Sequence, residues 1–150
     1  MQLDRTFFVT TTYKRYTYFR DFTKARRFFQ ALCHYRRENQ FLIHAFVLMP
    51  DHLHMIVTPS FSMPLEKTMQ LVKGGSSFRM RLPEKLWQHS FTNHRIRDLD
   101  DYEIHVGYIL RNPVKEKLAE SAEKYPLCSA WPGWKLDPIA TAAKAAFEAS

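Results

Sequence analysis

Two histidines lie two residues apart inside the apolar stretch FVLMPDHLHMIV, at residues 46–57. Side chains alternate between the two faces of a β-strand, so His52 and His54 are predicted to share one face. Two imidazoles on the same face can bind one metal ion, which neighbours in sequence could not do. The pair could also be ordinary strand histidines that are solvated or bonded to neighbours, and the spacing leaves both interpretations open. Four other histidines have no second histidine at this spacing, and we expect them to take core or surface positions. They are His44, His89, His94 and His105.

A tyrosine of a later predicted helix points away from the apolar side of that helix. At about 100° per residue, the apolar stripe of the segment DYEIHVGYILRN consists of Tyr102, Val106, Ile109 and Leu110. Tyr108 falls about 145° from the centre of this stripe, and Asn112 follows one turn later. His105, Arg111 and Lys115 lie on or beside the same side. A phenol that loses its proton can attack a phosphodiester, although each of these residues is also compatible with an exposed helix surface.

The excess of basic residues favours an anionic partner. Lys and Arg number 22 against 15 Asp and Glu, which gives a net charge of +7 and an isoelectric point near 9.5. Such a charge suits nucleic acid or a membrane surface, and by itself it does not distinguish them. For a nucleic acid, the candidate phosphate contacts are Lys73, Arg79, Arg95, Arg97, Arg111 and Lys115, beside many basic residues that are simply solvated.

Two further features could contribute to nucleic-acid binding. Aromatic side chains that could stack on unpaired bases, or belong to the core, are Trp87, Phe91, Trp131 and Trp134. The stretch KGGSS at residues 73–77 could let a ligand approach the backbone closely, because glycine has no Cβ. It could equally be a plain break in a helix.

Cysteine usage and hydropathy indicate an intracellular protein. Cys33 and Cys128 are the only cysteines and lack C-x-x-C spacing, so neither a disulfide framework nor a cysteine zinc site is indicated. The N-terminal MQLDRTFFVT lacks the arrangement of a signal peptide, and no apolar run reaches the length of a membrane span. We therefore expect a cytoplasmic protein that does not associate with membranes.

Apolar periodicity predicts a single domain of the α+β class. The length of 150 residues suits one domain. Strands are predicted at 6–13, 40–49 and 52–58, with an extended segment at 86–98. Helices are predicted at 21–38, from Ser62 or Pro64 to a break or bend at Gly74 and Gly75, from a cap at Asp100 or Asp101 to Asn112, and from Pro113 to Glu123. This order predicts a sandwich in which helices pack on one face of an antiparallel sheet.

Four segments together resemble the REP-associated tyrosine transposases, which belong to the single-tyrosine branch of the HUH nucleases. They are VLMPDHLHMIV, MQLVKGGSSFRMR, LWQHSFTNHRIRDLDDYEIHVGYILRNPVKEKL and YPLCSAW. The similarity runs from about Thr6 to Trp131. We therefore expect a nuclease domain at residues 1–131 and a C-terminal tail at residues 132–150, which can be flexible.

The resemblance implies a fold and a chemistry. The fold would be a ferredoxin-like or RRM-like sandwich, with the HUH motif on a strand and the tyrosine on a C-terminal helix. By resemblance, His52 and His54 would bind a divalent metal, Mg²⁺ or Mn²⁺, Asn112 would complete the metal site, and Tyr108 would be the nucleophile. Members of the family cut single-stranded DNA beside hairpins and leave a 5′-phosphotyrosine and a free 3′-hydroxyl. They work as monomers or homodimers, in the bacterial cytoplasm and in association with the nucleoid.

Two other functions remain compatible with the sequence. The chain could be a catalytically silent protein of the same fold that binds structured nucleic acid. It could also be a hydrolase that uses His52 and His54 for zinc or another metal, with Tyr108 incidental. The proton acceptor for Tyr108 stays open, with Lys115 and a metal-bound water as candidates.

Overall fold

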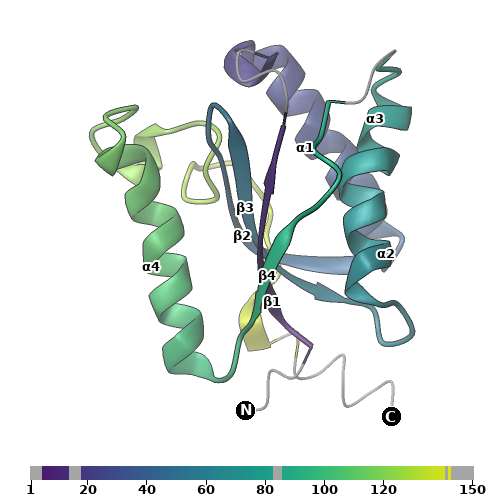
Figure 1. The fold of residues 1–150 in the computed structure, drawn as a ribbon. Helices are drawn as coiled ribbons and strands as arrows, with labels where there is room; N and C mark the ends of the chain where they lie inside the picture. The colour runs from purple at the N-terminus through teal and green to yellow at the C-terminus, as the bar shows by residue number, and fades with distance from the viewer. Residues whose placement is uncertain (1–4, 14–17, 83–85, 141, 143–150) are drawn as a thin grey trace.

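A four-stranded antiparallel sheet forms the centre of the molecule (Figure 1). The computed structural model describes residues 5–13, 18–82, 86–140 and 142. The strands are β1 (Phe7–Thr12), β2 (Phe41–Leu48), β3 (His52–Pro59) and β4 (Thr92–Arg95), in the spatial order β2-β3-β1-β4. Together with one helical connection after β1 and another after β3, this is the order of a ferredoxin-like sandwich. The predicted fold class is therefore confirmed.

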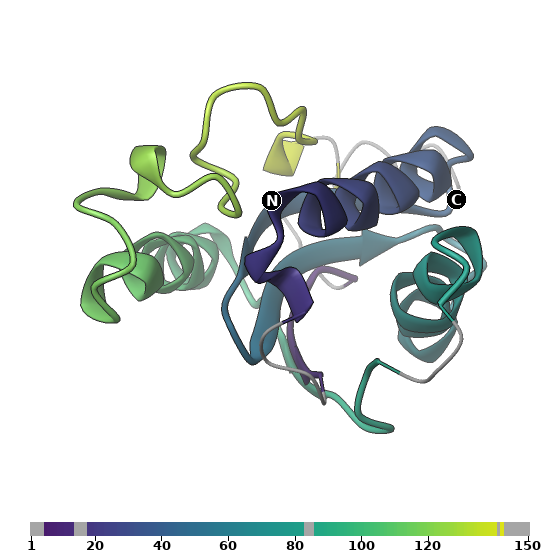
Figure 2. The same ribbon diagram turned by 90° about the horizontal axis from the view of Figure 1, so that it is seen from above.

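Helices cover both faces of the sheet (Figures 1 and 2). One face carries α1 (Phe22–Arg37) and a continuous helical run made of α2 (Leu65–Gln70), the π-helical turn η2 (Leu71–Gly75) and α3 (Ser76–Arg79). The other face carries α4 (Leu99–Lys115). Two short 3₁₀ helices complete the described elements, η1 (Tyr18–Arg20) and η3 (Ala122–Lys124).

The expectation that all helices pack on one face is wrong for α4. The sheet separates two apolar layers, and alternation along β3 supplies both of them. Leu53, Met55 and Val57 belong to the layer under α1, whereas Ile56 belongs to the layer under α4. Because β3 is buried on both faces, it reads as one apolar run, and its sequence does not reveal that a helix covers each side.

The helix α4 begins and ends differently from the prediction. The N-cap is Asp98, whose side chain accepts a hydrogen bond from the backbone N–H of Asp101, so neither Asp100 nor Asp101 caps the helix. Pro113 lies in the last turn of α4 and does not open a second helix. The chain leaves the helix through Lys117 at a φ of 59°, and the N–H of Leu118 donates to the Pro113 carbonyl at 2.8 Å. This Schellman-type ending stops the helix just after the proline.

The glycine pair at residues 74 and 75 does not break its helix. The backbone continues from α2 to α3 through the wider π-helical turn η2. At Gly75 a Cβ would lie 2.7 Å from the hydroxyl oxygen of Tyr35, so any larger residue would require the Tyr35 ring of α1 to shift. At Gly74 a Cβ would meet no atom within 4 Å.

The segment after α4 runs along the outer edge of β2. The Leu48 N–H donates to the Leu127 carbonyl at 2.8 Å, and the Ser129 N–H donates to the Phe46 carbonyl at 2.9 Å. Further along, the Asp137 N–H donates to the Ile43 carbonyl at 2.8 Å. These bonds satisfy the edge of the strand that β3 does not pair.

The residues just beyond 131, expected to belong to a tail, pack on the domain. The Trp134 ring lies 5.0 Å from that of Phe29, and the Asp137 carboxylate accepts two hydrogen bonds from Arg36 at 2.6 and 2.9 Å. These bonds link Arg36 of α1 to the segment that follows residue 131. Residue 141 and residues 143–150 of the expected tail lie outside the described residues. Among the described residues, no helix has the length and apolar character needed to cross a membrane.

Candidate active site

The histidine pair, His52 and His54, stands at the start of β3 on the face covered by α4. The two ring centroids are 4.5 Å apart, as expected for neighbours on one face. The Nδ1 atom of His52 lies 2.5 Å from a carboxylate oxygen of Asp51, and Nδ1 of His54 lies 2.7 Å from the hydroxyl of Thr10. Each ring therefore keeps its Nε2 atom for another partner.

The buried Nε2 atom of His54 has no hydrogen-bond partner among the described residues. A buried polar atom without a partner costs free energy, and a metal ion bound there would remove that cost. Burial, followed by the charge of His52, lowers the pKa of His54 to about 4, against the opposing effect of Asp51. The imidazole is thus neutral at pH 7, the form that binds metals. The pair fits a divalent metal by its donor chemistry.

Tyr108 lies against the histidine pair. Its ring centroid is 5.3 Å from that of His54 at an interplanar angle of 75°, although α4 and β3 are far apart in sequence. The side chain is 46% exposed, so an extended substrate can reach the phenol. The structure thus brings together three of the residues that the sequence singled out.

Phe8 is a member of this site that the sequence analysis did not select. It lies on β1, where its ring is 5.3 Å from His54 and 5.9 Å from Tyr108. Thr10 follows on the same face and orients His54. The alternation of FFVTTT predicts that Phe8 and Thr10 share one face of their strand. The register that sets Thr10 opposite His54 is decided only in the folded sheet.

Asn112 lies one turn beyond Tyr108 on α4 and is 8% exposed. Among the described residues, no hydrogen bond joins its amide to His52 or His54. Its burial keeps it on the protected side of the helix, whereas Tyr108 is half-exposed. The structure therefore sets Asn112 one turn after Tyr108 on α4, without a direct bond to the histidine pair.

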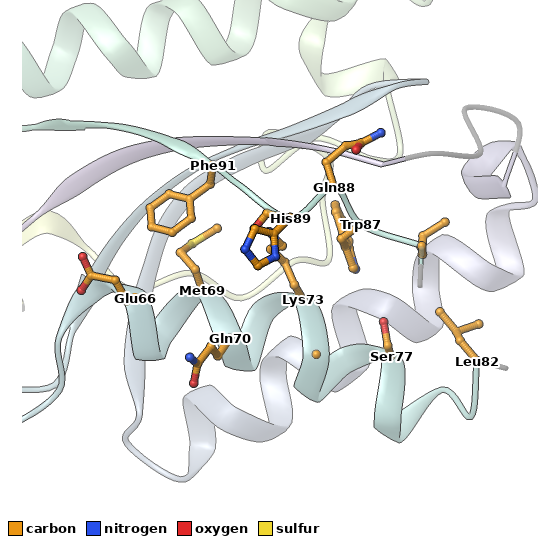
Figure 3. Close-up of a pocket in the computed structure, with 12 residues that line it drawn as sticks. Glu66, Met69, Gln70, Lys73, Ser77, Leu82, Trp87, Gln88, His89 and Phe91 are labelled. Carbon is orange, nitrogen blue, oxygen red and sulfur yellow. The ribbon is translucent and has the colours of Figure 1, made fainter. Parts of the chain in front are cut away.

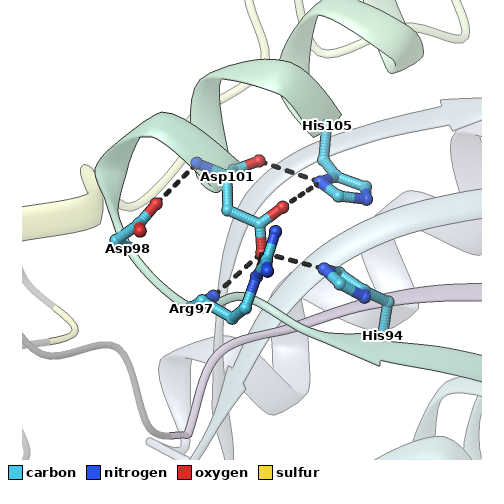
Figure 4. Close-up of polar contacts among 5 residues, drawn as sticks. All are labelled: His94, Arg97, Asp98, Asp101 and His105. Atoms are coloured by element: carbon cyan, nitrogen blue, oxygen red, sulfur yellow. Dashed lines mark hydrogen bonds and ion pairs between the residues drawn. The ribbon is translucent and has the colours of Figure 1, made fainter.

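A second group of polar residues joins β4 to the start of α4 (Figure 4). We name His94, Asp101 and His105 the anchor cluster. The carboxylate of Asp101, 4% exposed, lies 2.8 Å from Nε2 of His94 and 3.2 Å from Nδ1 of His105. It also accepts the backbone N–H of Arg97 at 2.9 Å. Sequence spacing had suggested no pairing for these histidines, and they meet only because α4 folds back over β4.

The bonding of the anchor cluster favours a structural role. Its three donor groups lie within 4.8 Å of one another, a spacing that a metal could bridge. However, Nδ1 of His105 is also 2.8 Å from the backbone carbonyl of Asp101, so this nitrogen carries a proton and donates. Burial alone would raise the pKa of Asp101, but the Arg97 N–H and the hydrogen bond and charges of His94 and His105 outweigh it and lower the pKa to about 2.

The six basic candidates for phosphate contacts do not form one patch. Arg111 and Lys115 are exposed on α4 after Tyr108, and Arg97 is exposed at the start of this helix. Arg111 folds back over Gly107, where a Cβ would lie 2.8 Å from its guanidinium. Of the other three, Lys73 and Arg79 belong to the helical run on the opposite face of the sheet, and Arg95 is paired with Phe7, which packs toward that face.

The sequence and the fold of the chain are similar to those of known transposases. The family described as "Transposase IS200 like" matches residues 5–112. Over 97 residues the chain is 32% identical to a REP-associated tyrosine transposase of Escherichia coli (strain K12), covering 64% of this chain and 58% of that protein. A relative from Haemophilus influenzae is 30% identical over 99 residues, covering 57% of this chain and 56% of its own length. The matched region thus spans little more than half the length of these curated relatives.

A solved structure shares most of the fold. A REP-associated tyrosine transposase bound to a REP hairpin superimposes with a TM-score of 0.70 and 25% sequence identity. The match covers 91% of this chain and 88% of that chain. The shared fold therefore extends over most of both chains.

Proposed function

Because the chain belongs to the IS200-like transposase family, we propose that it cleaves and rejoins single-stranded DNA through a covalent bond to Tyr108. The observation that carries this proposal is the contact between the half-exposed phenol and the ring of His54, whose Nε2 is buried and unpartnered. An accessible nucleophile and a free ligand atom are thus neighbours in the folded protein. The proposed catalytic domain is residues 1–131, with the following segment packed on it.

In this proposal His52 and His54 hold a divalent metal, Mg²⁺ or Mn²⁺, and Asn112 supplies a third ligand. Two imidazoles and an amide oxygen suit Mn²⁺ and, with more bound water, Mg²⁺. When bound, the metal polarises a phosphate oxygen and stabilises the charge that develops during phosphoryl transfer. The Asp51 and Thr10 side chains hold the rings through Nδ1, so that Nε2 of each ring would be left to bind the ion.

The chemical step is a transesterification at phosphorus. The phenolic oxygen of Tyr108 loses its proton and forms a bond to phosphorus, while the bond from phosphorus to the 3′-oxygen breaks. The 3′-oxygen takes up a proton, and the 5′-phosphate stays attached to the tyrosine. Since the number of phosphoester bonds is unchanged, a 3′-hydroxyl can later attack the phosphotyrosine and rejoin the strands without ATP.

The proposed substrate is a strand that carries a hairpin next to the cleavage site. The net charge of +7 supports an anionic partner, and Arg111 and Lys115 extend from the Tyr108 end of α4. The related solved protein is bound to a REP hairpin. These observations support structured DNA over a membrane surface or a small molecule.

A denaturing gel tests the proposal. The protein is incubated with a labelled hairpin-bearing DNA strand and Mn²⁺, and a covalent protein–DNA adduct is the expected product. Tyr108→Phe should abolish the adduct, whereas Tyr102→Phe, on the same helix but half-buried against His44, should retain it. An adduct that persists in Tyr108→Phe would overturn the nucleophile assignment.

The same assay separates the two other functions. Tight, salt-dependent binding without any adduct across a panel of hairpin strands would favour a catalytically silent binding protein. Metal-dependent turnover of a small substrate that is indifferent to Tyr108→Phe would favour a hydrolase.

A further inference from the structure

A pocket lies on the face of the sheet opposite to the candidate active site. It lies between the helical run α2–α3 and residues 86–91, opens to solvent, and has a volume of about 610 Å³. Figure 3 shows Met69 and Lys73 reaching toward it from the helix, with Phe91 and Trp87 on the opposite wall. Sites for small molecules in proteins usually have volumes of about 300–1,000 Å³, so this space can hold a group the size of a nucleobase.

The lining suits a flat aromatic group with polar edges. Phe91 is a half-buried aromatic ring on which a base can stack, and the buried side chains of Met69 and Trp87 complete the apolar part of the lining. Gln70 and Gln88 are exposed members of the lining, and each amide can both donate and accept hydrogen bonds. This combination is the usual chemistry for recognising an unpaired base.

A phosphate group fits the pocket less well. Among the described lining residues, Lys73 alone carries a permanent positive charge, and its ammonium already donates to the carbonyls of His89 and Ser90 at 3.0 and 3.4 Å. Burial also lowers the pKa of Lys73. The carboxylate of Glu66 belongs to the same lining and would repel an anion. The pocket therefore favours the base over the backbone of a nucleotide.

The pocket is close to the candidate active site around one edge of the sheet. The N–H of Gln88 donates to the Thr12 carbonyl at 2.8 Å, so residues 86–91 run beside the end of β1. On its other side, Thr12 is paired with His52. Neighbouring strands are about 4.8 Å apart, which puts the Gln88 backbone roughly 10 Å from that of His52.

We propose that this pocket binds one unpaired nucleobase of the strand whose phosphodiester is cleaved beside Tyr108. The inference rests on the proposed function, because it needs a single strand held at the histidine pair. A strand passing around the edge formed by residues 86–91 can place one base in the pocket while a nearby phosphate faces Tyr108. Base binding in the pocket thus sets the register of the strand and determines which bond is cut.

Binding of four short single strands tests this inference without requiring cleavage. Each strand is about 12 nucleotides long, a length that a single-strand binding surface can cover, and is built from three bases so that the fourth is missing. The strand that lacks the preferred base should bind about tenfold more weakly than the other three, because one stacked base is lost. Equal affinities for all four strands would overturn the proposal.

Gly74→Leu blocks the pocket from its helical wall. Gly74 lines the pocket, and a Cβ added there would meet no atom within 4 Å. The four strands should then bind alike, with the affinity of the weakest strand. Lys67→Leu adds the same side chain to an exposed position of α2 outside the pocket and should leave the preference intact. A preference that survives Gly74→Leu would contradict the proposal.

A second variant, Phe91→Leu, keeps the proposal testable if Gly74→Leu does not fold. Phe91→Leu keeps an apolar side chain but removes an aromatic stacking surface, and should reduce the preference severalfold. An unchanged preference in this variant would also count against the pocket. The adduct assay distinguishes the two proposals: base preference without cleavage supports the pocket and contradicts the proposed function. Cleavage without base preference supports the proposed function alone.

Discussion

The histidine pair and the anchor cluster occupy the same face of the sheet, yet their polar atoms are bonded to very different extents. In the anchor cluster, the Asp101 carboxylate accepts hydrogen bonds from His94 and from the Arg97 N–H, and Nδ1 of His105 donates to the backbone carbonyl of Asp101. In the histidine pair, Nε2 of His54 is buried without a partner. The ring of Phe8 contacts His54 on one side and His105 on the other, so the two groups are neighbours.

This difference separates structural histidines from histidines available for binding. In the anchor cluster, the ring nitrogens of His94 and His105 that face Asp101 are already used in hydrogen bonds, and the free energy of these bonds contributes to the docking of α4. A buried nitrogen without a partner lowers stability until it is bound. Composition alone would rank the anchor cluster higher as a metal site, because it contains a carboxylate. The hydrogen bonds favour the opposite order.

Alanine substitutions at matched histidines should give the largest contrast. His54→Ala should lower the cleavage rate at least about 100-fold, because it removes a ligand of the proposed metal. His94→Ala should lower cleavage by less than about tenfold, since it only weakens the docking of α4. DNA affinity, measured by fluorescence anisotropy, should change little in both. Equal losses of cleavage in the two variants would remove the distinction between the groups.

Asp101→Asn should affect stability more than chemistry. The variant keeps the shape of the side chain but replaces a buried carboxylate that serves several donors, at a cost of roughly 2–4 kcal/mol. Urea denaturation measures this free energy of unfolding. The affinity for Mn²⁺, measured by calorimetry, should stay at the wild-type value. A large loss of Mn²⁺ affinity with unchanged stability would instead identify the anchor cluster as the metal site.

The stability of the anchor cluster should depend on pH in a defined acidic window. The pKa of Asp101 is about 2 in the folded protein, below its ordinary value of 3.8. The unfolded chain therefore binds this proton more readily, so the contribution is complete above about pH 4 and disappears as the pH falls toward 2. Its size is on the order of 2 kcal/mol. Unfolding measured across this window should be steeper for wild type than for Asp101→Asn, and identical slopes would contradict the assignment.

Thr10→Val should give the smallest effect and tests the support of the histidine pair. The change removes the hydroxyl that lies 2.7 Å from Nδ1 of His54 while keeping the β-branched shape. Loss of such a supporting bond usually weakens metal binding about tenfold. Thr12→Val, on the same strand face, provides the control. Similar Mn²⁺ affinities for both variants would show that Thr10 does not orient the ring.

The sequence predicted the parts of the site that follow from local periodicity. Alternation placed His52 and His54 on one face, and the helical angle placed Tyr108 off the apolar stripe. Contacts between strands could not be predicted from the sequence, because register depends on the whole sheet. Phe8 and Thr10 were therefore not selected. The anchor cluster was missed for the same reason. Three aspartates at 98, 100 and 101 can each cap a helix, and only the fold decides that Asp98 does so while Asp101 is buried.

The pairing of β2 with residues 127–137 has a consequence during synthesis. A ribosome completes β2 and β3 long before it reaches Leu127, so the outer edge of β2 stays open in the nascent chain. An apolar strand with unpaired backbone groups is a template for association with other chains. The opposite edge of the sheet is less hazardous, because β4 is short and bears an exposed arginine, Arg95. Aggregation during expression should therefore begin at β2, and truncations that remove residues 127–137 should be the most insoluble.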